Sequence, residues 1–183
     1  MLSTLRVLVA TVAGMVFAAA GAGELLAQRT PIRVRLPGNQ QWIYIDSVAT
    51  DPVSVSASPA LAYKAAASVL QELKVPLAVD EPQNGLLGNG GFTVLHVLGR
   101  QRLSRYLSCG TSIGGAYADV RRITMALFVW IDSAGPAQAS VKVGVLASAQ
   151  EVGGVSRNAL ACESTGALEA FLADEIRKRA VMP

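Results

Sequence analysis

The feature that most constrains the fold is a pair of alternating apolar segments between residues 123 and 149. Every second residue is apolar in both segments: Ile123, Met125, Leu127, Val129 and Ile131, and then Val141, Val143, Val145, Ala147 and Ala149. Successive side chains of a strand point to opposite faces, so this pattern predicts two strands that each bury one face. The turn formers of residues 133–136 separate them. The sequence therefore predicts a long antiparallel hairpin.

Two other segments show the period of an amphipathic helix. The first follows Ser58 and Pro59, which suit the cap and the first position of a helix, and it stops before Pro76. The second follows the capping residues Ser164 and Thr165. The apolar faces consist of Ala62, Ala66, Val69, Leu70 and Leu73 in the first helix, and of Leu168, Phe171, Leu172 and Ile176 in the second. In the second helix, Asp174 and Lys178, and Glu175 and Arg179, have the spacing of favourable ion pairs.

Shorter extended segments complete the pattern, at residues 32–36, 42–46, 53–56, 77–80 and 92–97. Three regions between them are expected to be irregular or only locally ordered: a flexible glycine-rich loop at 85–91, a short helix at 100–107 and a loop at 108–119. Strands joined by short turns, together with two one-sided helices, predict a single α+β domain over residues 30–181. Its two layers would be an antiparallel sheet of about five or six strands and two main helices packed on one face.

Cys109 and Cys162 are the two cysteines of the chain, and we expect them to form a disulfide. The alternatives are free structural thiols, a reactive thiol or a metal site. The single histidine, His96, is distant in the sequence and gives no recognisable ligand spacing, so no metal is expected.

The first 27 residues have the character of an export signal. Residues 7–23 are uncharged and rich in Ala and Val, and they follow Arg6. A membrane-spanning helix needs about 20 strongly apolar residues, and small residues weaken the end of this segment. We expect cleavage near residue 22 or residue 27, with a retained N-terminal anchor as the alternative. The remaining domain would lie in the periplasm or outside the cell, without a stable membrane span, where disulfides persist.

Composition excludes several classes of protein. Hydrophobic residues make up 51% of the chain and charged residues 16%, which argues against disorder. The net charge is +3, and the longest basic run is residues 177–179, so no nucleic-acid partner is expected.

Residues that could perform catalysis are few. His96 lies in a run of Val and Leu without an identifiable acidic partner. The glycine-rich segment 85–91 lacks both the Walker A lysine and the dinucleotide-binding spacing. Asp80 and Glu81 are adjacent on an extended segment and therefore point to opposite faces. We therefore expect no catalytic residue and no cofactor. The protein is not expected to be an enzyme.

Two groups of residues are candidate binding sites. Arg105, Arg121 and Arg122 could contact an anion near the glycine-rich segment 109–115, although solvated arginines are the simpler interpretation. Four aromatic residues could line an apolar pocket between helix and sheet, or could simply pack in the core: Trp42, Tyr44, Phe128 and Trp130. Phe128 and Trp130 alternate with the buried positions of their strand, so the second face of the sheet is a candidate for coverage as well.

Three blocks of sequence resemble uncharacterised exported bacterial proteins: residues 104–110 (SRYLSCG), 118–124 (ADVRRIT) and 161–169 (ACESTGALE). Residues 59–180 also resemble, in order of elements, the helix-grip domains of the outer-membrane assembly lipoprotein C family. They share a helix followed by Val79-Asp80, an Asn84-Gly85 turn, a strand meander and a final helix. The sequence lacks the lipobox cysteine of that family.

The resemblance implies a role in the cell envelope and supplies no catalytic residue. We therefore expect a non-enzymatic module that binds an envelope protein through its sheet edge or exposed loops. The alternative is a carrier or sensor of a small apolar ligand bound between helix and sheet.

Overall fold

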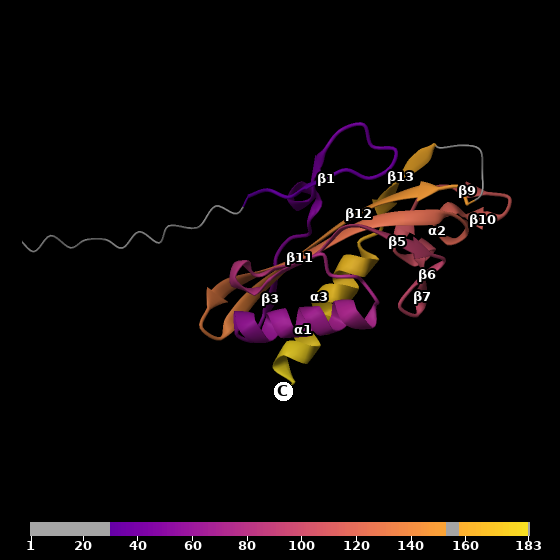
Figure 1. Cartoon of the computed structure of the whole chain (residues 1–183). Helices are drawn as coiled ribbons and strands as arrows, with labels where there is room; N and C mark the ends of the chain where they lie inside the picture. Colours follow the sequence, from indigo (N-terminus) through magenta and orange to yellow (C-terminus); the bar gives the residue numbers. More distant parts are fainter. Residues whose placement is uncertain (1–29, 153–157, 183) are drawn as a thin grey trace, which may run out of the picture.

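The computed structural model describes residues 30–152 and 158–182, so the expected export signal at residues 1–27 lies outside the described residues. The central antiparallel sheet has the strand order β4-β5-β11-β12-β13-β8, and β3 also pairs with β12. Its strands are β3 (Val53–Val55), β4 (Val79–Glu81), β5 (Leu86–Leu95), β8 (Leu107–Ser108), β11 (Arg122–Gly135), β12 (Gln138–Gln150) and β13 (Ala159–Ser164). Helices α1 (Pro59–Glu72) and α3 (Ala167–Val181) pack together on one face of this sheet (Figure 1). The predicted α+β architecture is confirmed.

The predicted hairpin forms the centre of the sheet. Strands β11 and β12 pair in register from Arg122 opposite Gln150 to Ser133 opposite Ala139, with an irregularity before Gly135. All ten residues that the alternation assigned to the inner face are buried, and they belong to the main core with α1 and α3. The period-2 pattern thus identified both the strands and their buried face.

Helix α1 begins and ends where its sequence predicts. The Ser58 hydroxyl accepts a hydrogen bond from the backbone N–H of Leu61, 3.4 Å away, and Pro59 occupies the first turn. Beyond Leu73, the chain turns at Lys74, whose φ of 59° is left-handed. The whole predicted apolar face of α1 is buried.

Helix α3 starts one residue after the predicted caps. Gly166, with φ of 79°, takes the N-cap position because it adopts the left-handed conformation without a steric cost. The hydroxyl of Thr165 accepts from the N–H of Ala167, and that of Ser164 accepts from the N–H of Gly166. The Ser164 hydroxyl also donates to the buried carboxylate of Glu169, 2.5 Å away.

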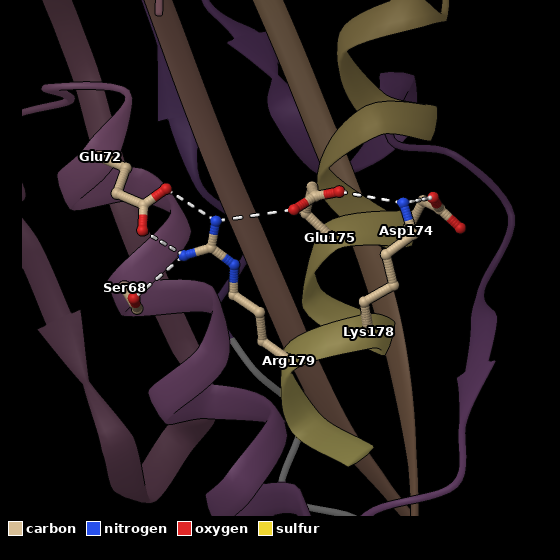
Figure 2. Close-up of polar contacts among 6 residues, drawn as sticks. All are labelled: Ser68, Glu72, Asp174, Glu175, Lys178 and Arg179. Atoms are coloured by element: carbon tan, nitrogen blue, oxygen red, sulfur yellow. Dashed lines mark hydrogen bonds and ion pairs between the residues drawn. The ribbon is translucent and has the colours of Figure 1, made fainter. Parts of the chain in front are cut away.

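A polar cluster joins the exposed sides of α1 and α3 (Figure 2). The Arg179 guanidinium donates to both carboxylate oxygens of Glu72, at 2.6 and 2.7 Å, and to the Ser68 hydroxyl at 3.2 Å. These hydrogen bonds lower the pKa of Glu72. The predicted pairs on α3 are also present, with Lys178 Nζ 2.7 Å from Asp174 and Arg179 3.6 Å from Glu175. The cluster holds α3 against the C-terminal end of α1.

The N-terminal part of the described chain covers the other face of the sheet (Figure 1). It contains β1 (Arg33–Val34), β2 (Ile43–Tyr44) and a 3-10 turn at Ile45–Val48. Its buried residues form a second core with the sheet: Val34, Leu36 and Ile45 with Leu86, Ala126, Phe128 and Trp130. The expected coverage of this second face is confirmed.

The glycine-rich segment 85–91 was expected to be a flexible loop, and that expectation is wrong. Residues 86–95 form β5, a ten-residue strand between β4 and β11. A Cβ on Gly88 would lie 2.2 Å from the carbonyl oxygen of Leu127, so only glycine permits this approach of β5 to β11. Opposite Met125–Leu127, β5 holds one extra residue, and this bulge at Gly90–Gly91 keeps Phe92 and Val94 on the buried face.

The interpretation of residues 92–119 also needs correction. The strand expected through residue 97 breaks at His96, whose φ is 62°. β6 (Val97–Leu98) follows the break. In place of the helix expected at 100–107 there are β7 (Gln101–Arg102), a 3-10 turn at Leu103–Arg105 and the start of β8. The segment 108–119 holds β9 (Thr111–Ser112), β10 (Gly115–Ala116) and α2 (Tyr117–Val120). Asp119 organises the region, because its carboxylate accepts from both the N–H and the hydroxyl of Ser104.

The predicted disulfide between Cys109 and Cys162 is confirmed. It connects the start of the β9–β10 segment to β13, and both cysteines are buried in the main core. A disulfide-bonded domain is consistent with an oxidising compartment.

Candidate functional site

One edge of the sheet is incompletely paired. Strand β5 pairs with β4 from Leu86 to Gly88, and on that side no strand of residues 30–152 or 158–182 pairs with it beyond Gly88. The N–H of Gly91 is satisfied locally by the Asn89 side chain at 2.8 Å. The outward-facing backbone groups of Phe92–Leu95 thus form an open edge of about four residues.

This edge lies in a groove of about 640 Å³. One wall is the end of α1 and the turn after it, and the other is the β6–β7 turn. The lining residues are Glu72, Leu73, Lys74, Pro76, Phe92, Thr93, Val94, Leu95, Val97, Leu98, Gly99 and Arg100. We call this the β5-edge groove.

Three specific polar contacts hold the walls of the groove in place. The Asn89 side-chain amide donates to the carbonyl of Pro76 at 2.6 Å, which holds the turn after α1 against the strand. On the other side, His96 Nδ1 lies 2.6 Å from the carbonyl of Asp119, and the carbonyl of His96 accepts from the N–H of Leu103 at 3.0 Å. These contacts give His96 a structural position at the end of β5.

Apolar surface and positive charge flank the edge. Leu95 is 47% exposed and Val97 is 50% exposed, although both are large apolar residues. Of the charged residues that line the groove, Glu72 is neutralised by Arg179, whereas Lys74 and Arg100 form no ion pair with a described residue. The groove therefore offers backbone hydrogen bonds, apolar contacts and a weakly positive rim.

These three features suit an extended polypeptide. A strand that pairs with an open edge forms main-chain hydrogen bonds, and its alternate side chains enter the adjoining pockets. Native proteins usually blunt such an edge by charge, proline or coverage. Thr93 and Leu95, the outward-pointing residues of the open segment on the face away from the helices, are uncharged.

The structure places the four aromatic residues predicted to line a pocket in two different environments, two of them buried and two exposed. Phe128 and Trp130 are buried, with ring centroids 6.1 Å apart, under the N-terminal segment. Trp42 is 57% exposed, with the Arg33 guanidinium 6.0 Å from its ring, and Tyr44 is also exposed. Helix α1 packs on the opposite face, so these residues do not line a helix–sheet cavity. The alternation in β11 already placed Phe128 and Trp130 on the face that the helices do not cover.

The three arginines of the anion hypothesis lie in different surroundings. The Arg121 guanidinium lies 3.8 Å from the ring centroid of Tyr117 and 3.3 Å from a Glu151 oxygen. Arg105 donates to the Gln101 side chain at 3.4 Å. Arg122 is exposed at the start of β11. Arg121 and Arg105 thus contact separate protein groups.

The sequence did not reveal the residues that build the β5-edge groove. Glu72 and Leu73 come from the end of α1 and Arg100 from the β6–β7 turn, and the position of that turn beside α1 depends on strand pairing. The available signal was the Gly88–Gly91 run, because glycines inside a strand indicate a bulge or a close backbone approach.

Comparisons with known proteins identify no relative: neither a protein-family model nor a curated protein matches the chain. The resemblance to helix-grip domains therefore stays a prediction. Within the described ranges, no helix is long and apolar enough to cross a membrane. The same residues contain no group of three or more His, Cys, Asp or Glu side chains placed to hold a metal ion.

Proposed function

We propose that the protein is an exported, non-enzymatic module of the cell envelope that binds an extended segment of a partner protein along the β5-edge groove. The observation that carries the proposal is the open edge of Phe92–Leu95 at the floor of a groove. A partner strand added there would extend the sheet by one strand beside β5.

The two faces of the added strand would meet different surfaces. Side chains on the helix side would enter the groove between Leu73 and Leu98, which are buried at its base. Side chains on the other side would lie beside Thr93 and Leu95. Lys74 and Arg100 would favour an acidic residue at the end of the segment.

Two observations support the envelope location. The chain contains a disulfide, which persists in oxidising compartments, and residues 1–27 have the composition of an export signal. The proposal includes no catalytic step, no cofactor and no nucleic-acid partner.

Site-specific photocrosslinking tests the proposal. The photoreactive residue p-benzoylphenylalanine would replace Thr93 in the chain expressed in its host envelope. A matched control carries it at Gln138, which is exposed at the far end of the β11–β12 hairpin, whereas Thr93 pairs with Thr124 near the start of β11. We expect a crosslinked protein from position 93 and none from position 138. Equal crosslinking at both positions, or none at position 93, would refute the proposal.

A further inference from the structure

A second concave surface lies at the other end of α1, beside the edge strand β4. It is a cleft of about 750 Å³, within the range of small-molecule sites. Its walls are the N-terminal part of α1, from Pro59 to Ala67, and the 3-10 turn Pro82–Asn84 after β4, and its floor is the end of β11. Most of the exposed surface of the lining is apolar. The lining residues are Pro59, Ala60, Tyr63, Lys64, Ala67, Asp80, Pro82, Gln83, Asn84, Gly85, Ile131 and Ser133.

One carboxylate in this cleft is held in place by a buried tyrosine. The Tyr63 hydroxyl lies 2.5 Å from Asp80 Oδ1, to which it donates, and 3.2 Å from the carbonyl oxygen of Leu86. Tyr63 is only 8% exposed. Burial, and then the Asp80 carboxylate, raise the pKa of Tyr63 far above its ordinary value, so it stays a neutral donor. Asp80 is thus oriented before any ligand arrives.

The second oxygen of Asp80 is available to a ligand. Asp80 Oδ2 forms no hydrogen bond with a described residue, and Asp80 itself is exposed. The neighbouring carboxylate of Glu81 is on the opposite face of β4, where it accepts from the Asn84 amide at 2.9 Å. Lys64 is the other charged residue of the lining, and it is exposed without an ion-pair partner among the described residues.

We propose that this cleft binds a small organic ammonium compound, with its cationic group on Asp80 and its apolar part against Ala60, Ala67 and Ile131. A preoriented carboxylate beside an apolar wall is complementary to a cation that carries an apolar body. The exposed Lys64 ammonium carries the same charge as that ligand, so it would oppose binding. The site is separate from the β5-edge groove and does not depend on it.

Phenethylammonium chloride and its neutral analogue 2-phenylethanol are suitable probes. In an NMR titration of the full exported domain, we expect shifts at the amides of Tyr63, Asp80 and Gly85. The ammonium compound should bind about tenfold more tightly than the alcohol, because hydrogen bonds to charged groups are stronger. Equal binding of the two probes, or shifts elsewhere in the domain, would overturn the assignment.

Three variants make the test specific. Asp80→Asn keeps the shape and should reduce ammonium binding about tenfold while leaving the weak alcohol binding unchanged. Tyr63→Phe should weaken ammonium binding less than Asp80→Asn does, because the Asp80 carboxylate keeps its charge and loses only its orientation. Lys64→Met should strengthen ammonium binding, because the substitution removes a charge of the same sign as the ligand. Unchanged binding in Asp80→Asn, or weaker binding in Lys64→Met, would refute an ammonium site.

The source of the ammonium group is tested in the same titration. The blocked peptide Ac-Ala-Ala-Lys-Ala-Ala-NH2 presents the same charge on a protein side chain. We expect it to bind more weakly than phenethylammonium. Tighter binding of the peptide would contradict the small-molecule assignment. Thermal unfolding of each variant identifies any that has lost its fold, and the probe comparison in the unmodified protein does not depend on the variants.

Discussion

Removal of the disulfide should destabilise the domain by an amount that follows from its position. Cys109 and Cys162 are 53 residues apart in the sequence, and the segment between them contains the whole β11–β12 hairpin. The chain-entropy model gives a stabilisation of about 4 kcal/mol for a loop of this size. The total stability of a domain is typically about 5–15 kcal/mol, so the loss would be a large fraction of it.

Equilibrium unfolding in urea measures this loss. The double variant Cys109→Ala, Cys162→Ala should unfold at a urea concentration lower by about 2 M, given a typical dependence of about 2 kcal/mol per M. Reduction of the unmodified protein with dithiothreitol is the matched control and should produce a similar shift. A loss below about 1 kcal/mol in both would refute the reasoning, because it would mean that the crosslink barely restricts the unfolded chain.

Three further predictions follow from the packing. Phe128→Ala should lower the free energy of unfolding in urea by about 3–5 kcal/mol, because Phe128 is buried under the N-terminal segment. Trp42 is exposed, so Trp42→Ala should change it by less than about 1 kcal/mol, and similar losses in the two variants would contradict these placements. Gly88→Ala should reduce the melting temperature strongly, because a Cβ there would lie 2.2 Å from the Leu127 carbonyl, while Gly91→Ala, with no atom within 4 Å of its Cβ, should have a much smaller effect. The raised pKa of Tyr63 contributes stability that is present below the ordinary tyrosine pKa of about 10 and is lost as the pH rises above it. Between about pH 8 and pH 11, the free energy of unfolding of Tyr63→Phe should therefore fall less than that of the unmodified protein. Burial also raises the pKa of Tyr106, but Tyr106 is present in both proteins, so identical pH profiles would contradict the assignment.

Periodicity in the sequence predicted the elements that bury one face. The alternation in residues 123–149 and the helical stripe after Pro59 determine which side chains leave water, and the structure buries those side chains. The prediction from sequence was wrong where tertiary contacts override the local conformational preference of a segment. The glycines of residues 88–91 are turn formers in isolation, but here they allow a close strand approach and a bulge.

The candidate groove depends on information that no local pattern contains. The sequence supported an interaction at a sheet edge, but it could not say which strand forms the edge. That depends on β4 being three residues long, so that it leaves the second half of β5 unpaired. The aromatic residues illustrate the same limit, because composition cannot distinguish a pocket lining from a core that a distant segment covers.

Hydrogen exchange at the open edge tests the proposed function most directly. The measurement compares the amides of Phe92–Leu95 in the free domain and in the complex with the partner captured at position 93. Strand addition predicts that the outward-facing amides of this segment become protected on binding, while the amides of the hairpin turn near Gln138 keep their free exchange rates. A complex in which Phe92–Leu95 exchange as fast as in the free domain would contradict partner binding along β5.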